Sequence, residues 1–202
     1  MKWIFKTLAI ALMLAVSANV MAQNMKKMDK EDIMQKQGWT KISPNEVKNA
    51  VTLFNNDWMA LAAGKSGDMN AMTISWGQMG ELWQRPVITV YVRESRYTKT
   101  FIDRYPYFTV TAFPEQYHKA LGYIGSHSGR DGDKLKVAGL TPEFTELGNP
   151  IFREANLAIE CKILYISPID TKKIDAQVLK DVYGDHDYHT MYIGEIVNVW
   201  KK

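Results

Sequence analysis

Short apolar segments separated by polar turns dominate the sequence from residue 58 onward, and most have the length and composition of β-strands. Gly64–Asp68, between the first two segments, has the composition of a hairpin turn, and Arg85–Pro86 is expected to end a segment. The predicted strands are 58–63, 71–76, 87–92, 107–113, 157–166 and 189–200, and the predicted helices are 97–105 and 116–125. Because strands dominate and no repeat or linker divides the chain, we predict one mainly β domain, a β-barrel with short connecting helices.

The first 22 residues have the pattern of a signal peptide. Lys2 and Lys6 precede an uninterrupted apolar segment at 8–16, which is well short of the ~20 residues that a membrane-spanning helix needs. Val20–Ala22 places small residues where a signal peptidase cleaves. Position 23 is Gln rather than Cys, so lipid anchoring is not indicated. We therefore expect export to the periplasm or secretion, without a stable membrane anchor.

Composition adds little about partners but completes the domain organisation. The formal net charge is +3, and the signal peptide carries two of the lysines, so the mature chain is nearly neutral and gives no electrostatic argument for nucleic-acid binding.

The single cysteine, Cys161, cannot form an internal disulfide and is expected to be a buried structural thiol. The predicted regions are a signal peptide at 1–22, a polar N-terminal arm at 23–38 and one folded domain at 39–202.

The second strand of the first hairpin carries more chemistry than a hairpin requires. An amide, two hydroxyls and an indole are crowded onto one short segment, together with Met72 and Ile74. This segment resembles the Asn-x-Met-Thr-x-Ser-Trp segment of the flavin reductase-like family, whose fold is the FMN-binding split barrel. The resemblance implies that the strand and its exit loop lie against the flavin ring and ribityl chain. The residues implied are Asn70, Met72, Thr73, Ile74, Ser75 and Trp76.

A second segment, Val90–Lys99, resembles the strand of that family that is followed by Arg-x-Thr and receives the FMN phosphate. Charged donors and a hydroxyl suit a phosphate, and amides at the start of the predicted helix would point at an anion. The alternative is an exposed loop with solvated charges and Thr98 as a helix N-cap. The residues implied are Arg93, Arg96, Tyr97 and Thr98.

A third segment, Ser128–Lys134, resembles the family's Ser-Gly-Arg-x-x-Asp-Lys turn, which closes over the cofactor. Glycine permits close approach of the backbone, and the polar side chains can donate hydrogen bonds. The alternative is an ordinary polar loop, above all for Asp131 and Asp133. The cofactor-binding residues implied are Ser128, Gly129, Arg130 and Lys134.

Near the C-terminal end, the segment from His189 to Val197 resembles the family's last core strand, His-x-x-x-x-Gly-Glu-Val. The resemblance implies that His189 is the catalytic residue, close to the reactive face of the flavin, where it orients a nicotinamide or shuttles a proton. A hydrogen-bonded structural histidine is the alternative. Asp185, His186, Asp187 and His189 include metal-ligand types, but no second cluster accompanies them, so no metal site is expected.

Together these segments imply an FMN-dependent oxidoreductase of the flavin reductase type. The Asp-Gly-x-Thr-Gly pattern of covalent attachment is absent from the sequence, so FMN should be noncovalent. The resemblance also implies a homodimer and hydride transfer from NAD(P)H to the flavin. Export separates the chain from cytoplasmic NAD(P)H, so a protein or quinol partner is an alternative donor. A second hypothesis is an exported FMN-binding electron carrier with no small-molecule substrate of its own.

Overall fold

The computed structural model describes residues 34–43 and 50–202. The predicted signal peptide and most of the predicted polar arm lie outside these residues. The chain separates into two units, Met1–Trp39 and Thr40–Lys202. In the first unit the described residues form a turn, in which the Trp39 N–H donates to the Met34 carbonyl at 2.9 Å. No helix within the described ranges is long and apolar enough to cross a membrane.

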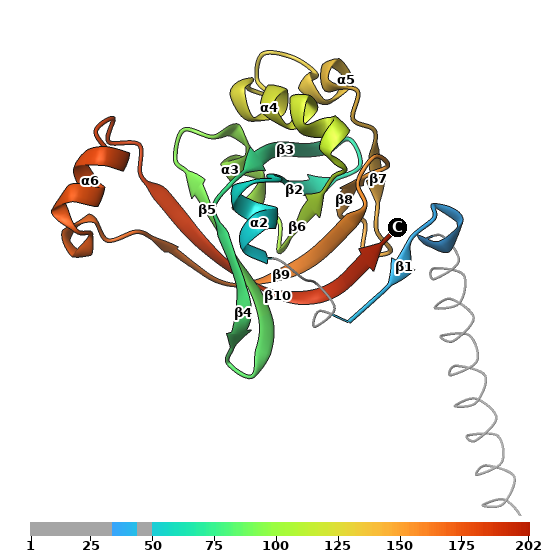
Figure 1. Ribbon diagram of the computed structural model, residues 1–202, viewed down its shortest axis with the longest axis horizontal. Helices are drawn as coiled ribbons and strands as arrows, with labels where there is room; N and C mark the ends of the chain where they lie inside the picture. Colours follow the sequence, from blue (N-terminus) through green and yellow to red (C-terminus); the bar gives the residue numbers. More distant parts are fainter. Residues whose placement is uncertain (1–33, 44–49) are drawn as a thin grey trace, which may run out of the picture. The chain divides into compact units, whose positions relative to one another are not determined.

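One antiparallel sheet organises the second unit (Figure 1). Its strands pair in the order β3-β2-β6-β9-β10-β5-β4, and β1 pairs with β10. The strands are β1 (Thr40–Lys41), β2 (Met59–Lys65), β3 (Asp68–Ile74), β4 (Gly77–Leu82), β5 (Arg85–Arg93), β6 (Tyr107–Ala112), β9 (Leu157–Pro168) and β10 (His189–Lys201). A separate two-stranded sheet contains β7 (Pro142–Phe144) and β8 (Pro150–Phe152). The predicted mainly β fold with short connecting helices is confirmed.

The hairpin β2–β3 forms as predicted, with a tighter turn. Lys65 pairs with Asp68, which leaves Ser66 and Gly67 as the turn residues. Gly67 has φ +80°, and Gly64 has φ +118°, in the left-handed region that glycine tolerates best. A Cβ on Gly64 would lie 2.2 Å from the Asp68 carbonyl oxygen, so the close approach of the paired strand β3 also requires glycine there.

The hairpin β4–β5 was not predicted. Arg85 and Pro86 do not end a segment, because both lie within β5, where Pro86 pairs with Glu81. The turn residues Trp83 and Gln84 have φ of 55° and 59°. Neither is the Gly or Asn that usually marks such a turn in a sequence. Most side chains of β4 are exposed, so the segment also lacks an apolar pattern.

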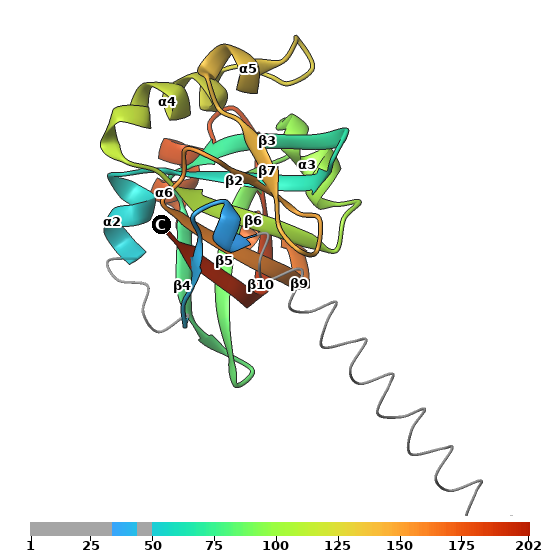
Figure 2. The ribbon, with the colours of Figure 1, turned by 90° about the vertical axis from the view of Figure 1, so that its right-hand side faces the viewer.

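Short helices occupy the connections, and Figures 1 and 2 show α4 and α5 on the side of the sheet where β3 lies. The predicted helix at 97–105 is shorter, and the one at 116–125 begins as a 3-10 turn at Glu115–Tyr117. A polar stretch between β9 and β10 adds α6 at the end of a two-stranded arm. The helices are α2 (Ala50–Asn55), α3 (Tyr97–Ile102), α4 (His118–Ser126), α5 (Lys134–Ala138) and α6 (Ala176–Val182).

Apolar side chains from β2, β5, β6, β9 and β10 form the core. Cys161 is fully buried, and burial raises the pKa of its thiol well above the ordinary value, as expected for a structural cysteine. The register of β10 against β9 shifts between Ile193 and Gly194. A Cβ at Gly194 would lie 2.7 Å from the Phe108 ring and 2.8 Å from Cys161, so only glycine fits where the strand crosses the core.

Candidate functional site

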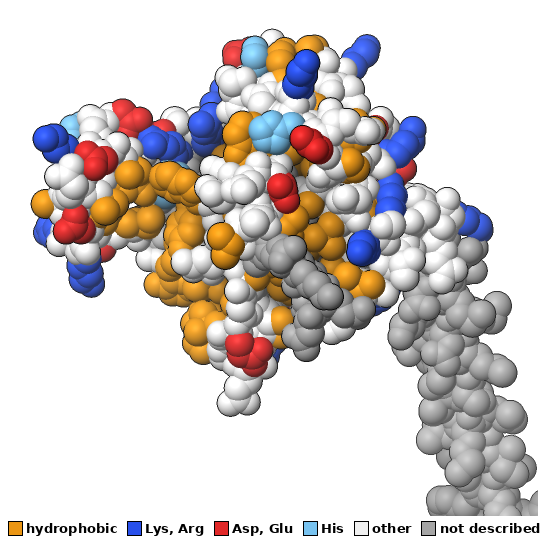
Figure 3. All heavy atoms as spheres, viewed as in Figure 1, with side chains coloured by type: hydrophobic (Ala, Val, Ile, Leu, Met, Phe, Trp, Pro, Cys, Tyr) orange, Lys and Arg blue, Asp and Glu red, His pale blue; other side chains and the backbone are white. Residues whose placement is uncertain are grey.

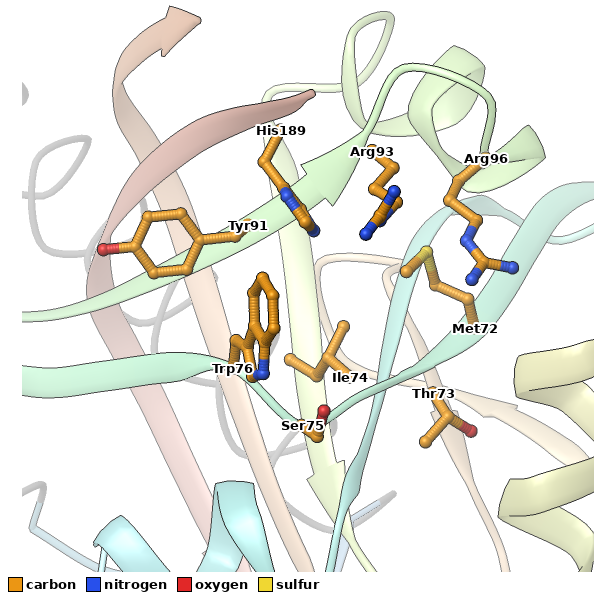
Figure 4. A pocket seen from close by; sticks show the side chains of 9 residues that line it. All are labelled: Met72, Thr73, Ile74, Ser75, Trp76, Tyr91, Arg93, Arg96 and His189. Atoms are coloured by element: carbon orange, nitrogen blue, oxygen red, sulfur yellow. The ribbon is translucent and has the colours of Figure 1, made fainter. Parts of the chain in front are cut away.

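A cavity of about 160 Å³ lies where β3, β5 and β10 approach one another (Figure 4). Three of the four sequence segments that suggested a flavin site contribute to it. The lining residues are Met72, Thr73, Ile74, Ser75, Trp76, Tyr91, Arg93, Arg96 and His189. All of these except Tyr91 were predicted site residues.

The sheet topology explains why these segments meet. β3 and β4 lie at opposite ends of the strand order, yet only Ser75 and Trp76 connect them in the chain. A link of two residues brings the two ends of the sheet together, so the sheet must curl. β5 pairs with both β4 and β10, which sets His189 beside this junction. The cavity therefore lies at the split in the curled sheet.

His189 is buried and held as a neutral imidazole. Its Nδ1 lies 2.9 Å from the Tyr183 hydroxyl oxygen, and its ring centroid lies 5.0 Å from that of Trp76. Burial, reinforced by the nearby Arg93 charge, lowers the pKa of His189 to about 4. Burial also raises the pKa of Tyr183, so its hydroxyl keeps its proton at neutral pH. When that hydroxyl donates to Nδ1, the ring proton is on Nε2, which is left for the cavity.

The last residue of α6 and the segment after it hold Arg93. The Arg93 Nη1 donates to Oδ2 of Asp185 at 2.8 Å and to the Asp187 carbonyl at 3.1 Å, and Nη2 donates to the Val182 carbonyl at 3.2 Å. The pKa of Asp185 is lowered first by a hydrogen bond from the Asp187 N–H and also by Arg93. The two acidic residues thus pair with a guanidinium. Within the described ranges there is no group of three or more His, Cys, Asp or Glu side chains suited to a metal.

Arg96 is the more available of the two cavity arginines. It is exposed, and its Nη1 donates to the Gly125 carbonyl at 3.1 Å. Figure 4 shows its guanidinium beside Met72, at the opposite end of the cavity from Tyr91. An exposed guanidinium with free N–H groups can bind a phosphate without first giving up an ion pair, which Arg93 would have to do.

Asn70, Tyr97, Gly129 and Lys134 line a different cavity, of about 340 Å³, together with Asp68 and Asp133. The Asn70 side-chain amide donates to the Thr98 hydroxyl at 2.9 Å, and both side chains are buried. Thr98 therefore does not cap α3. The N-cap residue of α3 is Arg96, whose side chain makes no capping hydrogen bond. A Cβ at Gly129 would lie 2.4 Å from Oδ1 of Asn70, so Gly129 permits the predicted close approach, but toward a side chain of this chain.

The remaining residues of the predicted Ser128–Lys134 turn also bond within the chain. The Lys134 Nζ donates to the Ile124 carbonyl at 2.7 Å and to the His127 carbonyl at 2.9 Å. Burial, then the Arg96 charge, lowers the pKa of Lys134 to about 8. Lys134 thus joins the start of α5 to the end of α4, and it does not line the first cavity.

Ser128 and Arg130 shape the same turn. The Ser128 hydroxyl accepts from the Arg130 N–H at 3.2 Å, and the Arg130 guanidinium lies over the Tyr97 ring, 4.7 Å from its centroid. Arg130 Nη1 also donates to the Ser95 carbonyl at 3.3 Å. The turn therefore packs against the loop between β5 and α3, and neither residue lines the first cavity.

Two site residues were missed in the sequence. Tyr91 stands between the buried Val90 and Val92, and this alternation alone indicates that it faces the other side of the strand. Tyr183 follows α6 in a polar stretch with no apolar pattern, so no local signal marks it as the partner of His189.

The side chains around the cavity fit a flavin mononucleotide. Arg96 offers a phosphate a guanidinium, Trp76 offers a planar ring an exposed aromatic face, and the Ser75 hydroxyl can bond to a ring edge. The Thr73 hydroxyl is already committed, because it donates to the Leu121 carbonyl of α4. Small-molecule sites commonly occupy about 300–1,000 Å³, so the cavity of about 160 Å³ encloses part of such a ligand.

Comparisons with known proteins agree with this fit. The family model of the flavin reductase like domain matches residues 54–202. A flavoredoxin from Desulfovibrio vulgaris (Miyazaki F) is 26% identical, with a TM-score of 0.56, over 72% of this chain and 68% of that chain. No curated protein matches the sequence.

Two further structures show the same fold. An FMN-binding domain of a flavin reductases-like enzyme from Shewanella baltica OS155 is 17% identical, with a TM-score of 0.59, over 81% of this chain and 76% of that chain. An NADH:FAD oxidoreductase from Streptomyces globisporus is 17% identical, with a TM-score of 0.55, over 72% of this chain and 75% of that chain. The open, curled antiparallel sheet is therefore an FMN-binding split barrel, as predicted.

Proposed function

Because the chain belongs to the flavin reductase-like domain family, we propose that it is an FMN-dependent oxidoreductase that passes electrons from a reduced donor to an acceptor. The observation that carries this proposal is the convergence of Met72–Trp76, Arg96 and His189 on one cavity from three separate parts of the sequence. Bound noncovalently, FMN would supply the redox chemistry. The donor is NAD(P)H or a protein or quinol partner.

The residues of this chain would bind the cofactor and control protons around it. Arg96 holds the phosphate, while Trp76 and His189 contact the ring. Tyr183 fixes the orientation of the imidazole. Since His189 has a pKa of about 4, it is neutral at pH 7 and acts there as a hydrogen-bonding group rather than as a cation.

Binding of FMN to the chain from residue 23 onward tests the proposal. We expect about one FMN per subunit, retained through gel filtration and released by heat, as for a single-pocket site. Absence of flavin fluorescence quenching in protein mixed with excess FMN would exclude the cofactor assignment.

An exported FMN-binding electron carrier without a substrate of its own is the second candidate function. Two observations favour it: the similarity to a flavoredoxin, and the 45% exposure of Trp76 at the edge of the cavity, where a protein partner could reach it. Stopped-flow mixing of the FMN complex with NADH, NADPH, a naphthoquinol or dithionite separates the two functions. Rapid bleaching by a nicotinamide or by the quinol supports the oxidoreductase, and bleaching by dithionite alone supports the carrier.

A homodimer is part of the same proposal. Leu82 and Trp83 at the tip of the β4–β5 hairpin, and Tyr165 and Ile166 on β9, are all at least one third exposed. The Trp83 and Tyr165 rings lie 6.3 Å apart, so these two side chains belong to one apolar surface. Figure 3 shows hydrophobic side chains around the hairpin. Such a surface favours burial against a second copy. Light scattering of the wild-type protein and of Trp83→Glu tests it, because the variant should shift the mass toward a monomer.

A further inference from the structure

A second, apolar cavity adjoins the candidate flavin site. Its volume is about 390 Å³, and it shares Ser75, Trp76 and Tyr91 with the first cavity. The remaining described residues that line it are uncharged. The large apolar side chains in its wall are Val51, Phe54, Trp76, Tyr91, Ile169 and Tyr183.

Close packing forms one wall of this cavity. Phe54, on α2, is 3% exposed, and a Cβ at Gly77 would lie 2.2 Å from its ring. The Phe54 ring therefore rests directly on the backbone of Gly77, the first residue of β4, a contact that any larger residue at position 77 would prevent.

Trp76, Tyr91 and Tyr183 connect the two cavities. Figure 4 shows the Tyr91 ring directed away from Arg93 and Arg96, on the other side of Trp76. Tyr183 lines the apolar cavity and bonds through its hydroxyl to His189 in the first cavity. A ring bound in the apolar cavity would therefore lie next to the aromatic side chains of the candidate flavin site. Figure 3 shows hydrophobic side chains on this face, between the α6 arm and the β4–β5 hairpin.

The lining selects the chemistry of the ligand. A diphosphate such as that of a nicotinamide dinucleotide would lose hydration there without meeting a cation, whereas an uncharged ring gains from burial. The Asn55 and Gln78 amides can donate to ring carbonyl oxygens. A volume of about 390 Å³ is within the common range of about 300–1,000 Å³ for small-molecule sites.

We propose that this apolar cavity binds the ring of an uncharged quinone or quinol beside the flavin. The position of the flavin rests on the proposed function, but the binding of the quinone ring does not. The inference names the class of small molecule that reaches the redox site, and it favours a quinol partner over a nicotinamide dinucleotide.

Equilibrium dialysis of the FMN-loaded chain with menadione tests this proposal, with a sulfonated naphthoquinone as the charged control ligand. Menadione should bind at least about tenfold more tightly than the sulfonate, because the sulfonate must be desolvated. Ile169→Asp and Val51→Asp should each weaken menadione binding by about tenfold while FMN binding is unchanged. Val51 is 80% exposed, so its variant should fold even where the Ile169 variant does not. Val178→Asp, on α6 outside both cavities, is the matched control and should change neither affinity.

Equal binding of both ligands, or unchanged menadione binding in a folded Asp variant, would overturn the proposal. FMN binding without menadione binding would refute this inference alone. Menadione binding that depends on Val51 in a chain that does not bind FMN would refute the proposed function and leave the apolar site in place.

Discussion

His189 lies directly opposite Arg93 in the antiparallel pairing of β10 with β5. The imidazole therefore sits next to a permanent cation, and the cation is itself held by Asp185 and by backbone carbonyls. The register of the two strands thus adds the Arg93 charge to burial, which is the larger cause of the lowered pKa of His189. Arg93 serves this electrostatic purpose whether or not it contacts a phosphate.

Protonation of His189 should destabilise the fold. Its pKa is about 4 in the fold, against an ordinary value of 6.5, so the unfolded chain binds the proton more tightly. The contribution of the neutral imidazole to the free energy of unfolding is fully present above pH 6.5 and is lost as the pH falls toward 4. At about 1.4 kcal/mol per unit of pKa, the loss reaches about 3 kcal/mol. Urea unfolding of the wild-type protein and of His189→Gln from pH 7 to 4 measures this loss. If the unfolding free energies of the two proteins changed with pH in parallel, His189 would not titrate in this way.

Arg96 should be specific for the phosphate of FMN. Arg96→Ala should weaken FMN by about 1.5–3 kcal/mol, the range for a hydrogen bond to a charged group, and should leave riboflavin binding nearly unchanged. Fluorescence titration with both flavins measures the difference. Arg153→Ala removes an exposed arginine that pairs with Glu143 outside the cavity, so it should affect neither ligand. Equal losses for FMN and riboflavin in Arg96→Ala would place the phosphate elsewhere.

Tyr183→Phe should leave the buried Nδ1 of His189 without its partner. The expected cost is about 1–3 kcal/mol of unfolding free energy, because a buried polar group is left unpaired. Nitrogen chemical shifts of the His189 ring should change, which a purely structural loss elsewhere would not cause. Tyr188→Phe is the matched control, since its hydroxyl bonds to the exposed His186, and it should cost under about 0.5 kcal/mol. Similar costs for the two variants would contradict the assigned role of Tyr183.

Gly194→Ala should be strongly destabilising. The added Cβ would lie 2.7 Å from the Phe108 ring in the core, and such overpacking typically costs about 1–3 kcal/mol. Gly80→Ala, on β4, is the control, because a Cβ there meets nothing within 4 Å. Thermal unfolding of both variants gives the comparison. A Gly194→Ala protein as stable as Gly80→Ala would mean that β10 can move away from Phe108.

We predict that the mature protein begins at Gln23 in its native cell. The basic start, the short apolar segment and the small residues before position 23 carry this expectation. N-terminal sequencing of protein from the soluble fraction of the cell envelope measures it. Intact Met1 on cytosolic protein would refute export and would favour NAD(P)H as the electron donor.

Strands with a clear apolar pattern could be predicted from the sequence, and exposed elements could not. β2, β6 and β10 lie within a few residues of their predicted ranges, because buried side chains give them apolar runs bounded by Gly, Pro or polar residues. β4 and α6 are largely exposed and lack that pattern.

The same distinction applies to the site. The structure brings Met72–Trp76, Arg93, Arg96 and His189 together around one cavity, because each segment lies on or next to a core strand. Lys134 was predicted to contact the cofactor, which stays a prediction, and in the structure it bonds to the end of α4. A lysine in a Gly-rich loop gives no local sign of which carbonyls it will meet. Tyr183 depends in the same way on the tertiary fold.

β10 follows every other strand in the sequence, yet it lies between β9 and β5 in the sheet. Until it is added, β5 and β4 have no pairing to the strands β3-β2-β6-β9. The cavity draws on both groups and on His189 at the first position of β10. A growing chain therefore cannot assemble the cavity before its final strand is made, and long-range closure of this kind slows folding. Whatever the compartment, the proposed cofactor can enter its cavity only after β10 has been made, and a chain that lost β10 would have no such cavity.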